Sequence, residues 1–548
     1  MFVAAVVSFA ASCAALLGPQ DPPQPASTGT LRLLGVTVHT GTDTPWTGVL
    51  GARHGRLARP DDVPVEHHGG VQFELPGAFV TAGIQDAHGH LLGLGSALVE
   101  VDLVGTTSFE EVVRKAAAAA EKLPKGAWVL GRGWDQNDWA DKAMPHHRAL
   151  SAAVPDHPVW LTRVDGHAGL ANQLALAAAK IGKGSVAPSG GEILFDDDGQ
   201  PTGVLIDNAM AKVPEPALSA EELRARLLAA QQACFAAGLT CVHDAGVSRA
   251  VLDAMVALHG EGRWGLRTYV MLAAGERELI ARGPWQTPDG LITVRAVKGY
   301  ADGALGSRGA VLLEPYADRP AWKGLFLTPE KGIAELAQRC AEHGMQLCTH
   351  AIGDAANRAV LDAYAAVQCD GGLASRRFRV EHAQVIAEDD FARFRSLGVL
   401  PSMQPTHLTS DMPWAPQRLG PARTLRAYAY RRFHALGLPV PFGSDFPVES
   451  VDPRKGFYAA ATTRAEGGDV ELRPDQKLSR AEVIRGFTAH AAYGMFAEKV
   501  LGTVEAGKIA DLTVWDTNLL TCPDAQLLTA KVLLTIVGGR VVYDGRPK

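Results

Sequence analysis

Residues 331–354 read KGIAELAQRCAEHG followed by MQLCTHAIGD, and this pairing recurs through the middle of the chain. In the first segment apolar residues recur at helical spacing, and the second segment is a short apolar run typical of a buried strand. Similar strand-like runs, separated by helical segments such as 219–238, occupy 239–246, 267–272, 293–303, 345–354, 378–384, 399–405 and 440–447. Alternating strands and helices predict an α/β fold with a parallel sheet. About eight units over roughly 400 residues favour a closed barrel over an open sheet.

The two ends of the chain and one central region depart from this alternation. Residues 31–41 and 48–58 have an alternating pattern broken at glycine, which predicts short strands with turns. The same holds for 507–516 and 533–545, and the latter carries a Gly-Gly hairpin signal. Residues 100–235 are interpreted as barrel units plus an insertion near the barrel mouth.

Composition excludes several classes of protein. The 548 residues are 47% hydrophobic and 20% charged, with a net charge of −6, so the chain can bury a large core. The balance of charge argues against a nucleic-acid partner or a polybasic membrane contact. Seven cysteines without a C-x-x-C pair fit neither a zinc ribbon nor a dense disulfide framework.

The N-terminus predicts a targeting segment. Residues 2–17 form an apolar run that is short for a membrane-spanning helix, and a Pro-rich stretch typical of a linker follows it. Residues 1–29 are therefore interpreted as a signal peptide and linker, which predicts a periplasmic or extracellular protein without a stable span in the mature chain. Cys13 offers only weak support for a lipoprotein anchor, and a cytoplasmic location is the alternative because no Lys or Arg precedes Arg32.

Polar residues recur where the strand-like runs end. Two imidazoles spaced two residues apart on a strand point to one face, so an H-x-H pair can bind a single ion. In a parallel barrel all carboxyl ends of strands meet at one mouth, where catalytic residues gather. Each residue alone is better explained as a strand cap or core histidine, but the set favours a zinc, iron or manganese site. The set is His88, His90, Lys298, His350, His382 and Asp445.

Several long strings of residues carry a resemblance to a known family. The strings DAHGH (86–90), GWDQNDW (133–139), DGHAGLAN (165–172), VKGYADGALGSR (297–308), THAIGDAANRAV (349–360), RVEHAQ (379–384), SMQPTHLTSDMPWA (402–415) and GSDFPVE (443–449) occur in the order of that family. The chain resembles the amidohydrolase superfamily, and most closely its YtcJ-like branch, which includes N-substituted formamide deformylases. The resemblance implies a distorted (β/α)8 TIM barrel at 80–498, with a small β-sandwich built from 30–79 and 499–548.

The resemblance also implies a role for each candidate ligand. His88 and His90 would bind the more buried metal with Asp445, and His350 and His382 would bind a second metal. Lys298 would bridge the two as a carbamate, since carboxylation turns its charge from +1 to −1; an ion pair with Asp302 is the alternative. One or two divalent ions are expected, with zinc favoured over iron or manganese. Asp445 would take the proton of a metal-activated hydroxide and deliver it to the leaving nitrogen.

Other residues of these motifs are candidates for contact with the substrate or for support of the ligands. Each also has a structural interpretation, such as a core aromatic, a surface arginine or a structural hydrogen bond. Asp354 and Glu381 are candidates to orient neighbouring histidines. The substrate-binding candidates are Trp134, Asp165, His167, Arg308, Gln404 and His407.

The leading hypothesis is a metal-dependent hydrolase acting on a non-peptide carbon–nitrogen bond, an amide or formamide of an apolar amine. A deaminase or cyclic-amide hydrolase that uses the same site is the second hypothesis of a hydrolytic enzyme. A ligand-binding or regulatory relative that keeps the fold is the non-enzymatic alternative, which the intact ligand set disfavours. The expected partner is a small-molecule substrate, and a homo-oligomer is left open.

Overall fold

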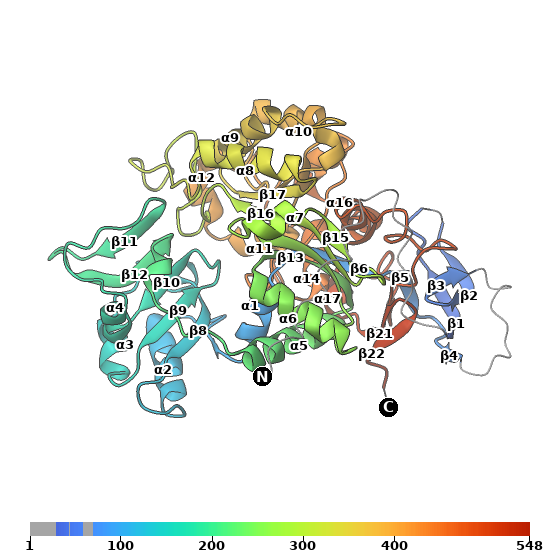
Figure 1. Cartoon of the computed structure of the whole chain (residues 1–548), viewed down its shortest axis with the longest axis horizontal. Helices are drawn as coiled ribbons and strands as arrows, with labels where there is room; N and C mark the ends of the chain where they lie inside the picture. The colour runs from blue at the N-terminus through green and yellow to red at the C-terminus, as the bar shows by residue number, and fades with distance from the viewer. Residues whose placement is uncertain (1–28, 43, 59–69, 548) are drawn as a thin grey trace, which may run out of the picture.

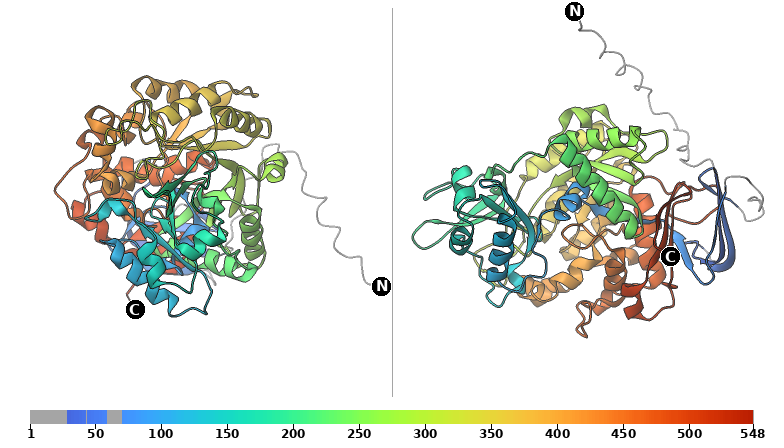
Figure 2. Two further views of the ribbon diagram at one scale, coloured as in Figure 1. Left: turned by 90° about the vertical axis from the view of Figure 1, so that its left-hand side faces the viewer. Right: turned by 90° about the horizontal axis from the view of Figure 1, so that it is seen from below.

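The computed structural model describes residues 29–42, 44–58 and 70–547. The predicted signal peptide and linker, apart from Gly29, lie outside the described residues. Three bodies lie side by side: a central barrel, an insertion on one side of it and a sheet made by the two chain ends on the other (Figures 1 and 2). Within the described part of the chain, no helix is both long and apolar enough to cross a bilayer.

Parallel strands form the central barrel. Seven of them pair in the order β19-β18-β17-β16-β14-β13-β6. Residues 440–445 take the eighth place, because Met403 forms a parallel bridge with Phe442 and the Ala87 amide donates to the Phe442 carbonyl at 3.0 Å. The predicted α/β class and TIM barrel are therefore confirmed. The strands are β6 (Ile84–Gly89), β13 (Leu239–Val247), β14 (Arg267–Ala273), β16 (Ile292–Tyr300), β17 (Gln346–Ala351), β18 (Arg379–His382) and β19 (Leu400–Ser402).

Helices cover the outside of this barrel. A capping box between Ser219 and Glu222 begins α5 (Ala220–Ala236) at the residue where the sequence pattern predicts a helix. This helix packs against α1 (Leu91–Ala97) so closely that a Cβ on Gly95 would lie 2.1 Å from the Arg226 carbonyl oxygen. The other helices after β13 are α6 (Arg249–Gly260), α7 (Arg277–Arg282), α8 (Glu330–Glu342), α9 (Asp354–Ala365), α10 (Phe391–Leu397), α11 (Pro405–Asp411), α12 (Ala415–Thr424), α13 (Tyr430–Ala435), α14 (Pro453–Thr462), α15 (Arg480–Arg485), α16 (Ala491–Gly494) and α17 (Asp524–Thr529).

The insertion is a separate six-stranded sheet with its own apolar cores. It runs from β7 to β12 and contains no barrel strand, whereas α5, at the end of the predicted range of 100–235, packs on the barrel. The sequence misled because β7, β8 and β9 are parallel and joined by helices, the local pattern of a barrel unit. Its elements are β7 (Val101–Asp102), α2 (Phe109–Ala120), β8 (Val129–Trp134), α3 (Arg148–Ala153), β9 (Val159–Arg163), β10 (Ala168–Ala171), α4 (Gln173–Ala178), β11 (Gly191–Phe195) and β12 (Pro201–Asp207).

The chain ends form one continuous sheet around a third apolar core. Its strand β5 pairs with β1 on one side and with β20 on the other, so the predicted boundary at residue 79 cuts through a strand that joins the two halves. The Gly-Gly signal forms the turn between the last two strands, with φ of 56° and 76° at Gly538 and Gly539. The strands are β1 (Thr30–Val38), β2 (Trp46–Arg53), β3 (Arg56–Ala58), β4 (Val71–Glu74), β5 (Phe79–Ala82), β20 (Leu512–Trp515), β21 (Val532–Val537) and β22 (Arg540–Asp544).

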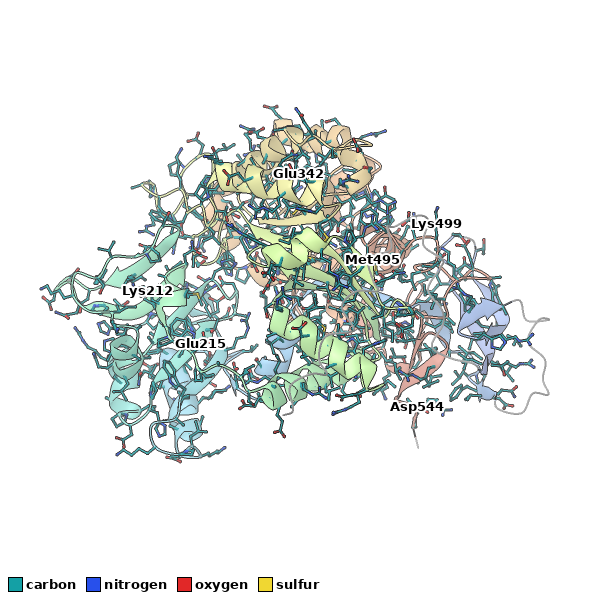
Figure 3. All side chains as sticks on the ribbon, in the orientation of Figure 1. Lys212, Glu215, Glu342, Met495, Lys499 and Asp544 are labelled. Carbon is teal, nitrogen blue, oxygen red and sulfur yellow. The ribbon has the colours of Figure 1, made fainter. Side chains whose placement is uncertain are left out.

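Side chains mark the three bodies in Figure 3. Lys212 and Glu215 lie on the segment that leads from the insertion back to the barrel, and Asp544 lies at the end of β22 on the opposite side. The insertion and the terminal sheet therefore lie on opposite sides of the barrel.

Candidate metal centre

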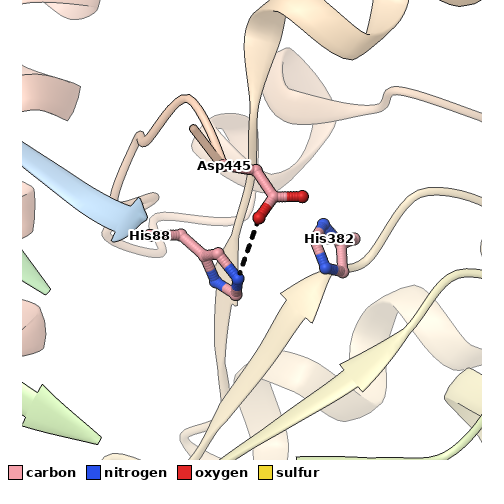
Figure 4. Close-up of side chains that lie close together, drawn as sticks. All are labelled: His88, His382 and Asp445. Carbon is pink, nitrogen blue, oxygen red and sulfur yellow. Dashed lines mark ion pairs between the residues drawn. The ribbon is translucent and has the colours of Figure 1, made fainter. Parts of the chain in front are cut away.

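Three potential metal ligands converge at the mouth of the barrel. Donor atoms of His88, His382 and Asp445 all lie within 4.8 Å of one another, and all three residues are buried (Figure 4). His88 Nε2 is 3.4 Å from Asp445 Oδ1, and His90 Nε2 is 3.1 Å from the same oxygen. The three come from β6, β18 and the segment that closes the barrel, which meet only because the barrel is closed.

Three histidines at the barrel mouth, His88, His90 and His382, are oriented alike. His88 Nδ1 donates to Glu381 Oε2 at 2.5 Å, His90 Nδ1 to the Ala245 carbonyl at 2.9 Å and His382 Nδ1 to Gln404 Oε1 at 2.7 Å. Because each partner atom is an acceptor, Nδ1 carries a proton, and in His88 and His382 Nε2 keeps a free lone pair. An imidazole held in this way by its second nitrogen is the usual state of a metal-ligating histidine. The donor set therefore fits a divalent ion such as zinc, iron or manganese.

Lys298 lies inside this group of ligands. It is 1% exposed, and its Nζ is 2.9 Å from His88 Nε2. The alternative of an ion pair with Asp302 is wrong, because the Asp302 carboxylate accepts instead from the amides of Val311, Ile352 and Gly353. Burial lowers the pKa of Lys298, against the opposing charges of Glu381 and Asp445.

His350 lies beside these ligands rather than among the three that converge most closely. Its ring centroid is 4.5 Å from that of His382. Its Nε2 faces the Gly303 carbonyl at 3.5 Å and Asp302 Oδ1 at 3.6 Å, which leaves Nδ1 as its available donor atom.

The backbone is strained at two of these ligands. His382 and Asp445 adopt φ of 74° and 65°, in a region that side-chain-bearing residues rarely occupy. Asp86 holds the second position by accepting from the Ser444 amide and hydroxyl at 3.1 and 2.6 Å. Each such conformation costs about 1–3 kcal/mol, so the surrounding contacts must impose it.

Burial sets the charge state of the site. It lowers the pKa of His88 to about 4 and the pKa values of His350 and His382 well below their usual range, so all three are neutral near pH 7. Burial alone would raise the pKa of Asp445, but the hydrogen bond from His90 and the field of His88 hold it well below the usual range. Neutral imidazoles beside an ionised carboxylate are ready to bind a cation without losing protons.

A cavity of ≈ 1300 Å³ opens from these ligands toward the insertion. Asp207 of β12 packs against the barrel loop so closely that Cβ atoms on Gly303 and Gly309 would lie 2.5 and 2.7 Å from its Oδ2. It also accepts from His167 Nδ1 at 2.6 Å, and the His167 ring centroid lies 5.1 Å from that of His350. The barrel lines the cavity with His90, Lys298, Tyr300, His350, His382 and Asp445, and the insertion with Arg132, Asp135, Arg163, Asp165, His167 and Asp207.

Four of the six substrate-binding candidates lie at this site. Asp165, His167 and His407 line the cavity, and His407 Nε2 is 3.8 Å from Asp445 Oδ2. Gln404 holds His382 and lines a small adjoining pocket.

Two candidates do not reach the cavity. Trp134 is fully buried in a core of the insertion, where its Nε1 donates to the Leu161 carbonyl at 2.8 Å. The large apolar indole packs in this core rather than at the cavity. Arg308 forms an ion pair with Asp318 at 2.9 Å and is not among the residues that line the cavity.

The two supporting carboxylates also have different places. Glu381 accepts from His88 Nδ1 and pairs with buried Arg379 at 2.7 Å, although in the sequence it adjoins His382. Asp354 does not orient His350; its Oδ1 accepts from the Leu313 amide at 2.9 Å because it begins α9 and faces that loop.

Sequence reasoning missed several residues of the site. Asp86 lies two residues before His88 on the same strand, and Arg379 lies two before Glu381, so alternation on a strand could have indicated both. Tyr300 lies two residues after Lys298 on β16, so the same alternation could have indicated it. Arg132 and Asp207 carried no such signal, since they enter the cavity only through the docking of the insertion on the barrel.

Known proteins are similar to this chain in sequence and in fold. The model of the amidohydrolase family described as "Amidohydro_3" matches residues 73–543. The Bacillus subtilis (strain 168) protein YtcJ is 31% identical over 486 residues, 86% of this chain and 90% of its own length. The N-substituted formamide deformylase of Arthrobacter pascens is 26% identical over 86% of this chain and 90% of its own. A crystal structure of an uncharacterized metal-dependent hydrolase from Pyrococcus horikoshii superposes with a TM-score of 0.74 at 26% identity, covering 90% and 99% of the two chains.

The barrel and these matches define the class: the chain has the fold of the amidohydrolases, is similar to a metal-dependent hydrolase and carries a candidate His/Asp metal site. It belongs to the amidohydrolase family, and YtcJ and the formamide deformylase support the predicted branch.

Proposed function

We propose that this protein hydrolyses the carbon–nitrogen bond of an amide or formamide that is not a peptide bond. The observation that carries the proposal is the convergence of His88, His382 and Asp445, with imidazole lone pairs facing one point in a large cavity. The named activity of the Arthrobacter relative, removal of a formyl group from a substituted nitrogen, supports the choice of bond.

We further propose that the site holds two divalent ions, zinc first among them. His88, His90 and Asp445 would hold one, and His350 and His382 the other. Lys298 would bridge them after its amine adds to CO2, which forms an N–C bond and releases one proton. Its Nζ, 2.9 Å from His88 Nε2, supports this position for the bridge. Bound divalent ions polarise a carbonyl oxygen and lower the pKa of water toward ~7.

Asp445 is the residue proposed to move protons. Its Oδ1 is 3.1 Å from His90 Nε2, and its Oδ2 is 3.8 Å from His407 Nε2 at the cavity wall. The carboxylate would take a proton from the attacking water as the new C–O bond forms. It would then return that proton to the nitrogen as the C–N bond breaks, so that one water, one carboxylic acid and one amine balance.

A substrate screen tests this function. Wild-type protein supplied with Zn²⁺ is assayed against N-substituted formamides, cyclic amides and aminated heterocycles, with release of amine or ammonia as readout. His350→Ala serves as the blank, and His146→Ala, on the insertion near Asp196, as the matched control. We expect formamide turnover in the wild type and in His146→Ala, and at least a 100-fold loss in the blank. Release of ammonia from heterocycles alone, or equal rates in wild type and blank, would overturn the proposal.

A further inference from the structure

Arg132 is a cation without an acidic partner inside the active-site cavity. It lies on β8 of the insertion and lines the same cavity as the ligands. Its Nη2 donates to the Val164 carbonyl at 2.8 Å, and its buried Nε has no partner. No carboxylate of the described residues lies within 4.0 Å of its guanidinium. A guanidinium withdrawn from water is costly unless it is paired, so this arrangement needs an explanation.

The carboxylates around Arg132 are already engaged elsewhere. Asp165 pairs with Arg163 at 2.5 Å, and Glu100 pairs with Arg226 at 2.7 Å. Asp102, beside Arg132 in the sheet, accepts from the Val104 amide at 3.0 Å. Asp165 and Glu100 could close on the guanidinium only by leaving another arginine, and Asp102 forms no ion pair with it.

Arg163 shows what a paired arginine looks like in the same wall. It contacts Asp135 and Asp165 on one side and Gln136 Oε1 at 2.9 Å on the other, so its donors are used. Two arginines from neighbouring strands thus face one cavity, one neutralised by the protein and one left for a ligand. Guanidinium is the group that proteins use to bind carboxylates with two parallel hydrogen bonds.

We propose that Arg132 binds a carboxylate of the substrate, so that the preferred substrates are amides of the N-formyl or N-acyl amino-acid type rather than amides of uncharged amines. This inference rests on the proposed function and specifies its substrate class. The scissile carbonyl would lie at the barrel ligands, and the carboxylate would extend toward the insertion.

Two compounds that differ only in the carboxylate test the inference: N-formylphenylalanine and N-formyl-2-phenylethylamine. The wild type should show a higher kcat/KM for the acid by about 10- to 100-fold, the range expected for a charged hydrogen bond. In Arg132→Gln the ratio of the two kcat/KM values should fall by the same factor. Arg132→Lys keeps the positive charge but loses the two parallel donors of the guanidinium, so its ratio should lie between those of the wild type and Arg132→Gln.

The matched control is Arg148→Gln, an exposed arginine of the same insertion that pairs with Asp196 outside the cavity. It should leave the ratio unchanged, and thermal unfolding of each variant shows whether the insertion is folded. A wild-type preference for the uncharged compound, or equal losses for both compounds in Arg132→Gln, overturns the carboxylate site while the hydrolase stands. If neither compound is hydrolysed, calorimetry measures the binding of both compounds to the wild type and to Arg132→Gln. An affinity for the acid that is the same in the two proteins overturns the inference.

Discussion

The barrel mouth and the insertion face each other across one cavity, but they line it with different chemistry. The barrel contributes Lys298 and a group of buried potential metal ligands, among them the neutral His88 and the ionised Asp445, with donor atoms close together. The insertion contributes charged groups that are mostly paired with one another, such as Arg163 with Asp165 and His167 with Asp207. The difference shows a division of labour in which the barrel supplies the reaction centre and the insertion supplies the wall that selects the substrate.

The first way to break this division is to remove the proposed proton carrier from the barrel. Asp445→Asn keeps a ligand oxygen but loses the basic carboxylate, so kcat should fall by about 1,000-fold or more while most of the metal remains bound. Metal content and formamide turnover measured on one preparation check this. Asp196→Asn, on the insertion surface, should behave as wild type. Full activity in Asp445→Asn would remove it as the base.

The second change breaks the insertion and spares the barrel. Trp134→Ala removes a buried indole from the insertion core and should cost about 3–5 kcal/mol of folding free energy. Because that core is separate from the barrel core, the metal content should stay as in wild type while kcat/KM falls. Denaturant unfolding and metal analysis test this, with Trp134→Phe as the milder control. Loss of metal in Trp134→Ala would show that the two regions do not act separately.

The third change alters a residue that orients a metal ligand but is not itself a ligand. Glu381→Gln weakens the hold on His88 Nδ1 without touching a metal, so metal affinity should fall by about 10- to 100-fold. Competition with a chelator measures that affinity. Gln338→Glu, on the exposed face of α8, changes charge in the opposite sense far from the site and should have no effect. An unchanged affinity in Glu381→Gln would mean that His88 needs no partner.

The smallest expected effect is on the stability of the protein at acidic pH. Burial lowers the pKa of His490 to about 3, beside the His434 ring at 5.2 Å. Below its unfolded value of 6.5 the unfolded chain binds the proton and the folded chain does not, so stability is lost as the pH falls from 6.5 toward 3. His490→Gln should therefore flatten the dependence of unfolding free energy on pH between 7 and 5. An unchanged slope would contradict a buried, neutral His490.

Sequence reasoning worked best where a local pattern repeats. Strand-end residues such as His350 and His382 were predictable because a parallel barrel brings every carboxyl end to one mouth. The boundary of the insertion was not, since β7, β8 and β9 repeat the barrel's own local pattern. The alternation of apolar and polar residues shows which face of a strand each side chain occupies. Which of two sheets the strand joins depends instead on packing between segments that are far apart in the sequence.

The substrate side of the site was less predictable for the same reason. Trp134 and Arg308 belong to family strings, yet one fills a core and the other pairs with Asp318. Arg132 and Asp207 reach the cavity only because the insertion docks on the loop that contains Gly303 and Gly309. Such contacts leave no periodic trace in the sequence.

The central claim is that the carboxyl ends of the barrel strands hold metal. Anomalous diffraction from crystals of the purified protein, recorded at the absorption edges of zinc, iron and manganese, tests it most directly. If these strand ends bind metal, one or two strong peaks should lie about 2.0–2.2 Å from His88 Nε2 and the Asp445 carboxylate, the bonding distances of zinc. Crystals that show no peak there, from protein that still hydrolyses formamides, would contradict it.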